Sequence, residues 1–249
     1  MKVKFCIASF AILFSFHYSH SQNVKTIVTK LGEKSSGLKE VYHVLKDSPS
    51  IKHGTYEYFA GTHSVVSGSY YHGEKDGVWD YHNYKGVCNE RMYNKGMKTG
   101  IWQNTNRDGQ LTCGYDFSKG QGIEYIKGEH LDTLQCYVQL ADGRWGKDTS
   151  VKSPVSLFTS FAWSSFLMTN LRYPEEALNR HATGRVMVTI TCDESGHAIN
   201  YEVISNTDSS LNAEALRVIR LFDFEFLPPE KEGKKIKFQI DQPVGFKLE

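Results

Sequence analysis

The side chains that usually carry out catalysis are present in this sequence, but their spacing matches no catalytic motif. There is no His-Glu-x-x-His pair for zinc, no Gly-x-Ser-x-Gly nucleophile turn and no P-loop lysine. Gly120-Gln121-Gly122 is a lone Gly-x-Gly, which is typical of a turn. We therefore expect no enzyme activity, no catalytic residue and no cofactor. Only a cluster of perturbed titratable groups in a cleft would favour an enzyme.

Histidines and cysteines could bind a metal, and the cysteines could form disulfides. His53, His72 and His82 share no repeat position, and His181 and His197 flank a predicted strand, so we expect all five at the surface. No Cys-x-x-Cys pair or Cys/His cluster has zinc spacing, and we predict no metal site. Four cysteines beyond the N-terminal segment are either paired in one of three ways or free: Cys88, Cys113, Cys136 and Cys192.

Composition excludes several classes of protein. The chain has 249 residues, and 29 Lys and Arg against 28 Asp and Glu give a formal net charge of +1. Such a balance provides no global attraction to nucleic acid or anionic lipid. The mean hydropathy of −0.44 excludes a multi-span membrane protein. With 21 Gly and 14 Tyr but only 6 Pro, the composition favours many short strands joined by turns.

The first 21 residues have the features of an export signal. Lys2 and Lys4 precede an uncharged apolar run at 5–16, which is too short to span a bilayer. Ser19-His20-Ser21 then offers small residues at both key positions of a cleavage site. We predict cleavage that leaves Gln22 as the mature N-terminus, and the alternative is an uncleaved membrane anchor.

The middle of the chain repeats with a period of 23 residues. Gly54, Gly77 and Gly100 are each 23 residues apart, and an aromatic residue stands two positions after each of them. A second signature has the same period: Tyr70 with Gly73, then Tyr93 with Gly96. Independent positions that share one period indicate a repeat architecture. Alternation of apolar and polar residues between glycine turns predicts one β-hairpin per repeat.

A single hairpin cannot bury its own apolar face, so the repeats are expected to stack into an elongated sheet with an aromatic core. The alternative is that exposed aromatic side chains bind sugars or peptides. The Tyr-x-x-Gly-x-x-x-Gly-x-Trp pattern resembles MORN and MORN-like repeats over residues 52–146, with a degenerate closing unit at 142–146. The resemblance implies a scaffold that binds proteins or surfaces.

The C-terminal third has the periodicity of a separate α+β domain. Apolar residues recur at helical spacing up to Leu171, and Pro174 separates that helix from the next one. Two alternating segments flank a turn at 193–196 and predict a hairpin. The expected elements are helices at 157–171, at 174–184 and from a cap at Ser209 or Ser210 to 222, and strands at 186–190, 198–204 and 236–240.

Short sequence strings in this third occur in a characteristic order. They are Leu171-Arg172-Tyr173-Pro174-Glu175-Glu176-Ala177, Gly184-Arg185-Val186-Met187-Val188, Asp193-Glu194-Ser195-Gly196, Glu214-Ala215-Leu216, the runs 224–228 and 234–240, and Pro243-Val244-Gly245-Phe246. With these strings, residues 155–249 resemble the C-terminal domain of TonB-type energy transducers. In that family the domain lies in the periplasm and grips an extended peptide, the TonB box, of an outer-membrane receptor.

The resemblance implies that a partner strand pairs with the last strand of the domain by β-augmentation. The residues expected in that strand are Lys234, Lys235, Ile236, Lys237, Phe238, Gln239 and Ile240. Its lysines either steer an acidic peptide or protect an exposed edge from aggregation. A weaker correspondence places Leu178, Asn179 and Arg180 in the receptor-facing region.

Two features of a full transducer do not match. No Ser is followed by His four residues later within residues 1–21, although that pair marks the segment that engages the proton-driven motor. The sequence also has only 6 prolines, and the repeats stand where a Pro-rich spacer would be. The resemblance therefore extends to the binding domain and not to the motor attachment.

These observations predict a mainly β protein: a MORN-like β-hairpin repeat sheet followed by a small TonB-like α+β domain with an antiparallel sheet. The expected parts are a signal peptide at 1–21, a lead-in at 22–51, repeats at 52–146, a linker at 147–153 and the C-terminal domain at 154–249.

We expect a periplasmic or cell-envelope protein whose C-terminal domain pairs with an extended segment of an outer-membrane receptor or another envelope protein. One alternative is an inner-membrane-anchored energy transducer that supports outer-membrane transport, and another is a scaffold that only holds partners together. We expect no nucleic acid and no small-molecule substrate as partner, and membrane contact only if the N-terminal segment is uncleaved.

Overall fold

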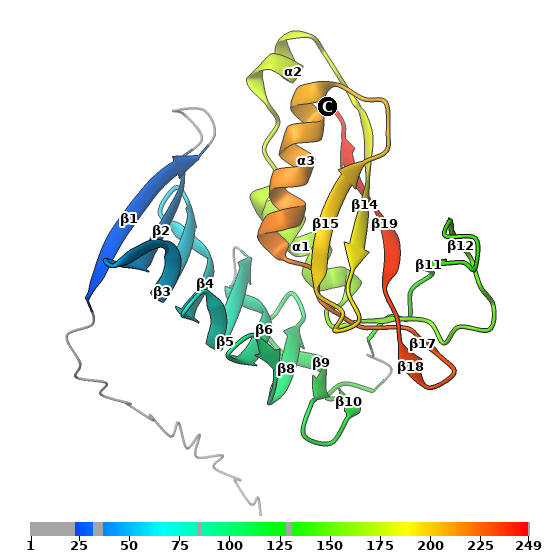
Figure 1. Ribbon diagram of the computed structural model, residues 1–249. Coiled ribbons are helices and arrows are strands. Elements are labelled where there is room, and N and C mark those ends of the chain that lie inside the picture. Colours follow the sequence, from blue (N-terminus) through cyan, green and yellow to red (C-terminus); the bar gives the residue numbers. More distant parts are fainter. Residues whose placement is uncertain (1–22, 32–36, 84–85, 128–130, 249) are drawn as a thin grey trace, which may run out of the picture.

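The computed structural model describes residues 23–31, 37–83, 86–127 and 131–248, so the predicted signal peptide lies outside the described residues. Most of the described chain is β-structure, and the sheets are antiparallel (Figure 1). Helices α1 and α3 lie between a long N-terminal sheet and a smaller C-terminal sheet. Among these residues, no helix combines the length and apolar character that crossing a membrane requires.

The N-terminal sheet has ten strands that pair in chain order. They are β1 (Val24–Leu31), β2 (Leu38–Leu45), β3 (Ser48–Ala60), β4 (His63–Tyr71), β5 (Glu74–Asn83), β6 (Gly86–Asn94), β7 (Met97–Lys98), β8 (Ile101–Thr105), β9 (Leu111–Asp116) and β10 (Gln121–Glu124). Only β7 is off this path, beside β6. The lead-in segment thus contributes two full strands of the sheet.

Positions 23 residues apart have the same structural role in this sheet. Tyr56, Trp79 and Trp102 are all buried on the face that is turned toward the helices. The Trp79 indole N–H donates to the Ser69 carbonyl at 3.0 Å, and the Trp102 indole N–H makes the equivalent bond to the Met92 carbonyl at 2.9 Å. The repeat seen in the sequence is therefore a repeat of packing and hydrogen bonding.

Gly77 differs from its expected position. It lies within β5 rather than in a turn, and its φ of 75° is one that residues with a Cβ rarely adopt. Gly54 and Gly100 also have a positive φ, of 99° and 61°. Because the pairing of β4 with β5 shifts register nearby, these glycines allow irregular strands to stay in the sheet.

The C-terminal unit contains the predicted order of main elements. These are α1 (Ser160–Asn170), α2 (Glu175–Asn179), β14 (Gly184–Cys192), β15 (Ala198–Val203), α3 (Ser209–Phe222) and β19 (Phe238–Phe246). Four short strands lie outside the main sheet: β13 (Val155–Ser156), β16 (Phe226–Leu227), β17 (Glu230–Lys231) and β18 (Lys234–Lys235). The N-cap of α3 is Asp208, whose side chain accepts from the Ser210 N–H, so neither Ser209 nor Ser210 is the cap.

The boundary between the two units also differs from expectation. Strands β11 (Tyr137–Gln139) and β12 (Trp145–Gly146) join the C-terminal sheet, whose order is β12-β11-β19-β14-β15. The segment expected as a closing repeat unit at 142–146 is therefore the turn and second strand of a hairpin beside β19. The short alternating pattern of residues 142–146 would fit a strand of either sheet. The hairpin joins the C-terminal sheet because β11 pairs with β19.

One continuous core joins the two units. Helix α1 contacts β5 and β6, and α3 packs against β14 and β15. The Phe222 ring lies 5.7 Å from that of Tyr81 in β5 and 5.0 Å from that of Phe166 in α1. The four cysteines of the described chain are free thiols, and three of them are buried.

Candidate functional site

The last strand, β19, has one paired side and one largely open side. Along its whole length it pairs with β14, from Phe238 opposite Cys192 to Phe246 opposite Gly184. On the other side β11 covers only its beginning, with Tyr137 opposite Gln239. Beyond this short contact, no described strand pairs with that side of β19.

The direction of each backbone group in β19 follows from the pairing of β14. The Met187 carbonyl accepts from the Ile204 N–H, so Met187 points toward β15. Because backbone groups of successive residues point to opposite sides of a strand, Val188 points toward β19 and its partner Gln242 points back. The even-numbered residues of β19 therefore bond to β14, and the odd-numbered ones face the other side.

The open edge therefore consists of Asp241, Pro243 and Gly245. Asp241 and Gly245 each present one N–H and one carbonyl, whereas Pro243 presents only a carbonyl. Proline inside a sheet is confined to edge strands, which agrees with its position on this side. A partner strand could exchange hydrogen bonds with Asp241 and Gly245 and accept none from Pro243.

The seven residues expected to form one partner-binding strand are divided between two elements. Lys234 and Lys235 form β18 and pair with β17, and the Ile236 N–H donates to the Pro229 carbonyl. Lys237 is exposed and belongs to no strand. The prediction of the strand bounds was therefore wrong, because the charged turn uses its own backbone groups in a small hairpin.

The remaining residues of that prediction lie at the start of β19. Phe238 and Ile240 are buried and point their backbone groups toward β14. Gln239 faces the other side but already pairs with Tyr137. The open positions thus begin at Asp241, one residue after the predicted segment ends.

The weaker candidates lie at the end of α2. Leu178 and Asn179 are exposed. The Arg180 guanidinium makes a bidentate contact with the Asp208 carboxylate at 2.8 and 3.0 Å, which fixes α2 to the N-terminus of α3. Their helix α2 packs against α3, at the end of the C-terminal unit that Figure 1 shows at the top.

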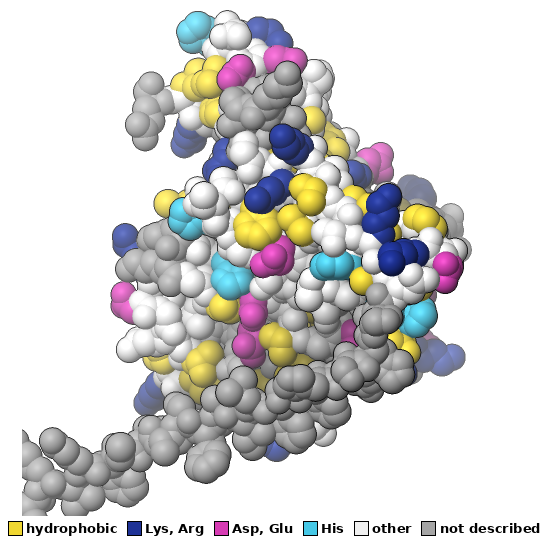
Figure 2. All heavy atoms as spheres, turned by 90° about the vertical axis from the view of Figure 1, so that its left-hand side faces the viewer, with side chains coloured by type: hydrophobic (Ala, Val, Ile, Leu, Met, Phe, Trp, Pro, Cys, Tyr) yellow, Lys and Arg dark blue, Asp and Glu magenta, His cyan; other side chains and the backbone are white. Residues whose placement is uncertain are grey.

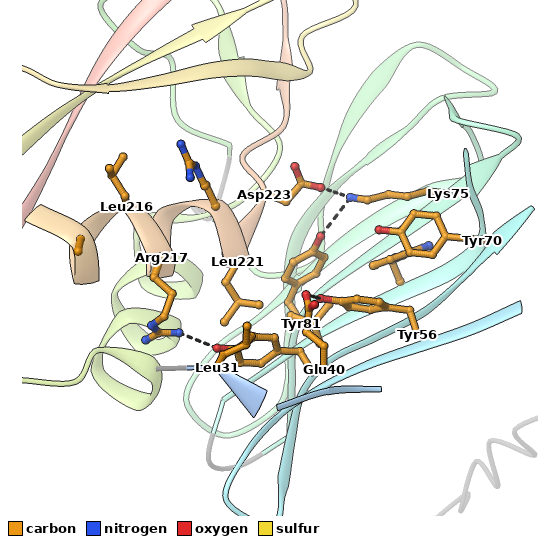
Figure 3. Close-up of a pocket in the computed structure, with 15 residues that line it drawn as sticks. Leu31, Glu40, Tyr56, Tyr70, Lys75, Tyr81, Leu216, Arg217, Leu221 and Asp223 are labelled. Atoms are coloured by element: carbon orange, nitrogen blue, oxygen red, sulfur yellow. Dashed lines mark hydrogen bonds and ion pairs between the residues drawn. The ribbon is translucent and has the colours of Figure 1, made fainter. Parts of the chain in front are cut away.

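A cleft that the sequence did not predict lies between α3 and the first half of the ten-stranded N-terminal sheet, which is called the repeat sheet below (Figure 3). Its volume is about 620 Å³. Arg217 and Leu221 enter it from α3, opposite Tyr56 and Tyr70 of the sheet. The remaining lining residues are Leu31, Glu40, Tyr58, Val66, Lys75, Trp79, Tyr81, Ala213, Leu216, Arg220 and Asp223.

Ion pairs connect the repeat sheet to the segment after α3. Lys75 pairs with Asp223, and Lys98 lies 2.8 Å from the Glu225 carboxylate. The fully buried Arg91 donates to the backbone carbonyls of Phe222 and Asp223. These contacts fix one orientation of the C-terminal unit on the sheet.

Glu225 is at the centre of this network. Its Oε1 lies 3.0 Å from the Tyr93 hydroxyl, which donates to it, and 2.7 Å from His197 Nδ1. Burial opposes ionisation, but Lys98 and His197 outweigh it and lower the pKa of Glu225 to about 2. The charged groups here pair with one another, so the network is suited to holding parts together rather than to catalysis.

Two histidines lie differently from the surface positions expected for them. His53 is 5% exposed and accepts a hydrogen bond from the His72 N–H, with its ring 5.3 Å from that of Tyr71. His197 contacts Glu225 at the junction. Figure 2 shows histidines scattered among basic, acidic and apolar side chains rather than gathered in one patch. Within the described chain, no group of three His, Cys, Asp or Glu residues could hold a metal.

Comparison with known proteins shows what the C-terminal unit resembles. Residues 169–248 match the family described as the Gram-negative bacterial TonB protein C-terminal. A similar solved structure is the solution structure of the Helicobacter pylori TonB C-terminal domain, which is 25% identical over 35% of this chain and 79% of that chain, with a TM-score of 0.25. A search of curated proteins found no match.

The family match runs from the end of α1 through β19. This part of the chain is therefore similar to the TonB C-terminal domain, and it contains the open strand edge described above. The MORN-like nature of residues 52–146 stays a prediction.

Proposed function

We propose that this protein is an exported cell-envelope binding protein that pairs its β19 edge with an extended segment of an outer-membrane receptor or another envelope protein. The observation that carries the proposal is the outward backbone of Asp241 and Gly245, which pairs with no described strand, in a segment similar to the TonB C-terminal domain. An extended peptide that adds to a sheet edge gains main-chain hydrogen bonds without needing a deep pocket.

In this proposal the repeat sheet is a scaffold. The ion pairs of Lys75 and Lys98 and the buried Arg91 hold the C-terminal unit against it. A partner strand on β19 would therefore be presented in a fixed orientation relative to the long sheet. This geometry supports binding rather than catalysis.

Photo-crosslinking in a native cell envelope tests the proposed edge. A photoreactive residue at position 245 is expected to crosslink to an outer-membrane receptor or another envelope protein. The matched control is Ile199, which is 54% exposed on β15, the edge strand on the far side of β14 in the same sheet. Equal adducts at both positions, or adducts at position 199 alone, would contradict the proposal.

A further inference from the structure

Three lysines occur at the repeat period on the sheet face that is turned toward the C-terminal unit. Lys52, Lys75 and Lys98 are each 23 residues apart. Lys75 meets Asp223, and Lys98 meets Glu225. The segment at 223–225 thus supplies one carboxylate to each of two successive repeat positions.

The aromatic surroundings of Lys52 repeat those of Lys75. The Lys75 ammonium lies 4.7 Å from the ring centroid of Trp79 and 4.9 Å from that of Tyr93. The Lys52 ammonium lies 4.7 Å from Tyr56 and 5.2 Å from Tyr70, which precede those two rings by 23 residues each. The repeat therefore places a cage of two corresponding rings around each lysine, and at Lys52 the Tyr42 ring adds a third at 4.7 Å.

The two cages differ in the carboxylate that completes them. Lys75 has Asp223, but no carboxylate of the described chain lies within ion-pair distance of Lys52. The Glu40 carboxylate instead accepts from the Tyr56 hydroxyl at 2.8 Å. Burial lowers the pKa of the half-buried Lys52 more than the charge of Glu40 raises it. Lys52 therefore keeps a partly desolvated ammonium without an ion-pair partner.

The cage of Lys52 adjoins the cleft through two of its rings, although Lys52 itself is not one of the lining residues. Tyr56 and Tyr70 both line the cleft, and so does Arg220, an exposed cation with no carboxylate of the described chain at ion-pair distance. Two other cations of the cleft are already neutralised, Lys75 by Asp223 and Arg217 by Glu214. Lys52, which lies beside the lining residues rather than among them, and Arg220 are then two cations of the described chain without an ion-pair partner, against one remaining carboxylate, that of Glu40. Charge complementarity therefore favours an acidic occupant.

We propose that Lys52, Tyr56 and Tyr70 form a binding site for a carboxylate side chain of an extended acidic peptide from a partner protein. The peptide enters the cleft between α3 and the repeat sheet. It occupies the Lys52 cage as Asp223 occupies the Lys75 cage, so the protein's own segment 223–225 is the template for its ligand. This site is separate from the β19 edge and does not depend on the proposed strand pairing.

The test uses a synthetic probe that imitates the template. A fluorescein-labelled peptide Gly-Ser-Phe-Glu-Phe-Ser-Gly is titrated with the full mature chain, beside the same peptide with Gln in place of Glu. The Glu peptide is expected to bind at least about tenfold more tightly, since a charge-assisted contact is lost with Gln. Free glutarate serves as competitor, and displacement of the peptide at equal concentration would show that a small anion alone is the ligand.

Variants locate the binding. Lys52→Gln is expected to weaken the Glu peptide about tenfold, whereas Lys52→Arg retains most of the affinity. The matched control is Lys39→Gln, which removes a lysine that also lies over a ring, that of Phe59, at 4.6 Å. A thermal melt of each variant shows whether it is still folded. Nuclear magnetic resonance shifts of Tyr56 and Tyr70 show whether the peptide still binds beside these rings. The proposal is overturned if the Gln peptide binds equally, if Lys52→Gln binds unchanged, or if the Kd of the wild-type protein exceeds about 1 mM.

Discussion

At the residue scale, close packing depends on glycines, which leave room for a neighbouring ring, as much as on the large side chains themselves. A Cβ on Gly68 would lie 2.3 Å from the Trp79 ring, although the φ of Gly68 is ordinary. The sequence shows the glycine and the tryptophan, but nothing in it shows that one lies on the other. The same holds for Asp223 and Glu225, whose partners Lys75 and Lys98 are more than a hundred residues away.

We expect Gly68→Ala to destabilise the sheet by about 1–3 kcal/mol, because the new methyl group displaces the buried Trp79 indole. Chemical denaturation followed by tryptophan fluorescence measures this change. The control is Gly245→Ala, where a Cβ meets no atom within 4 Å, and its expected effect is under about 0.5 kcal/mol. Equal effects of the two substitutions would refute the packing argument.

Asp80 gives a prediction about pH. Burial, and to a smaller extent the charge of Glu90, raise its pKa from 3.8 to about 6. The folded state therefore holds this proton more tightly than the unfolded state, and the contribution of Asp80 to stability falls as pH rises from about 4 to 6. We expect Asp80→Asn to add about 1 kcal/mol near pH 7, a value discounted for the partial exposure of Asp80, and almost nothing near pH 4. A gain that does not change with pH would be inconsistent with this cause.

At the element scale, periodicity predicted the main helices and strands of both units, and pairing decided the rest. The strand expected at 236–240 begins two residues later and extends to Phe246, because β14 offers nine residues to pair with. The hairpin at 137–146 is too short for its sequence to indicate which of the two sheets it joins. The open edge of β19 could not be predicted either, since it depends on where β11 ends.

The alternation along β19 predicts opposite effects of proline at two positions. Gly245→Pro removes an outward N–H, so we expect it to abolish partner pairing while the melting temperature stays nearly unchanged. Phe238→Pro removes an N–H that bonds to Cys192 and a buried ring, so we expect it to destabilise by about 3 kcal/mol or more. Pull-down of the crosslinked partner, with a thermal melt of each variant, checks both. Normal pairing by Gly245→Pro would exclude the assigned edge.

At the scale of the whole molecule, the two units behave as one body because charged side chains are buried between them. Breaking a buried ion pair leaves the other charge without a partner, and this costs far more than losing a surface pair. The 23-residue period of the lysines can be seen in the sequence. Their ion pairs cannot be predicted from it, because the partner carboxylates come from a segment that is not part of the repeat.

Glu225→Gln is expected to lower the free energy of unfolding by about 3 kcal/mol near pH 7, since Lys98 is left buried without its carboxylate. The pKa of Glu225 in the folded state, about 2, is below its ordinary value of 4.5. Its contribution is therefore complete above about pH 4.5 and is lost as the pH falls toward 2. Urea unfolding of both proteins across this range should show the difference between them shrinking, and a constant difference would contradict the assigned ionisation.

The central claim is that a partner strand pairs with the open edge of β19. The most direct measurement is residue-resolved amide hydrogen exchange of the chain, alone and in complex with the envelope partner identified by crosslinking. We predict that the outward amides of Asp241 and Gly245 exchange at least about tenfold more slowly in the complex, while the amides bonded to β14 change little. Unchanged exchange at Asp241 and Gly245 in the bound state would show that the partner binds elsewhere.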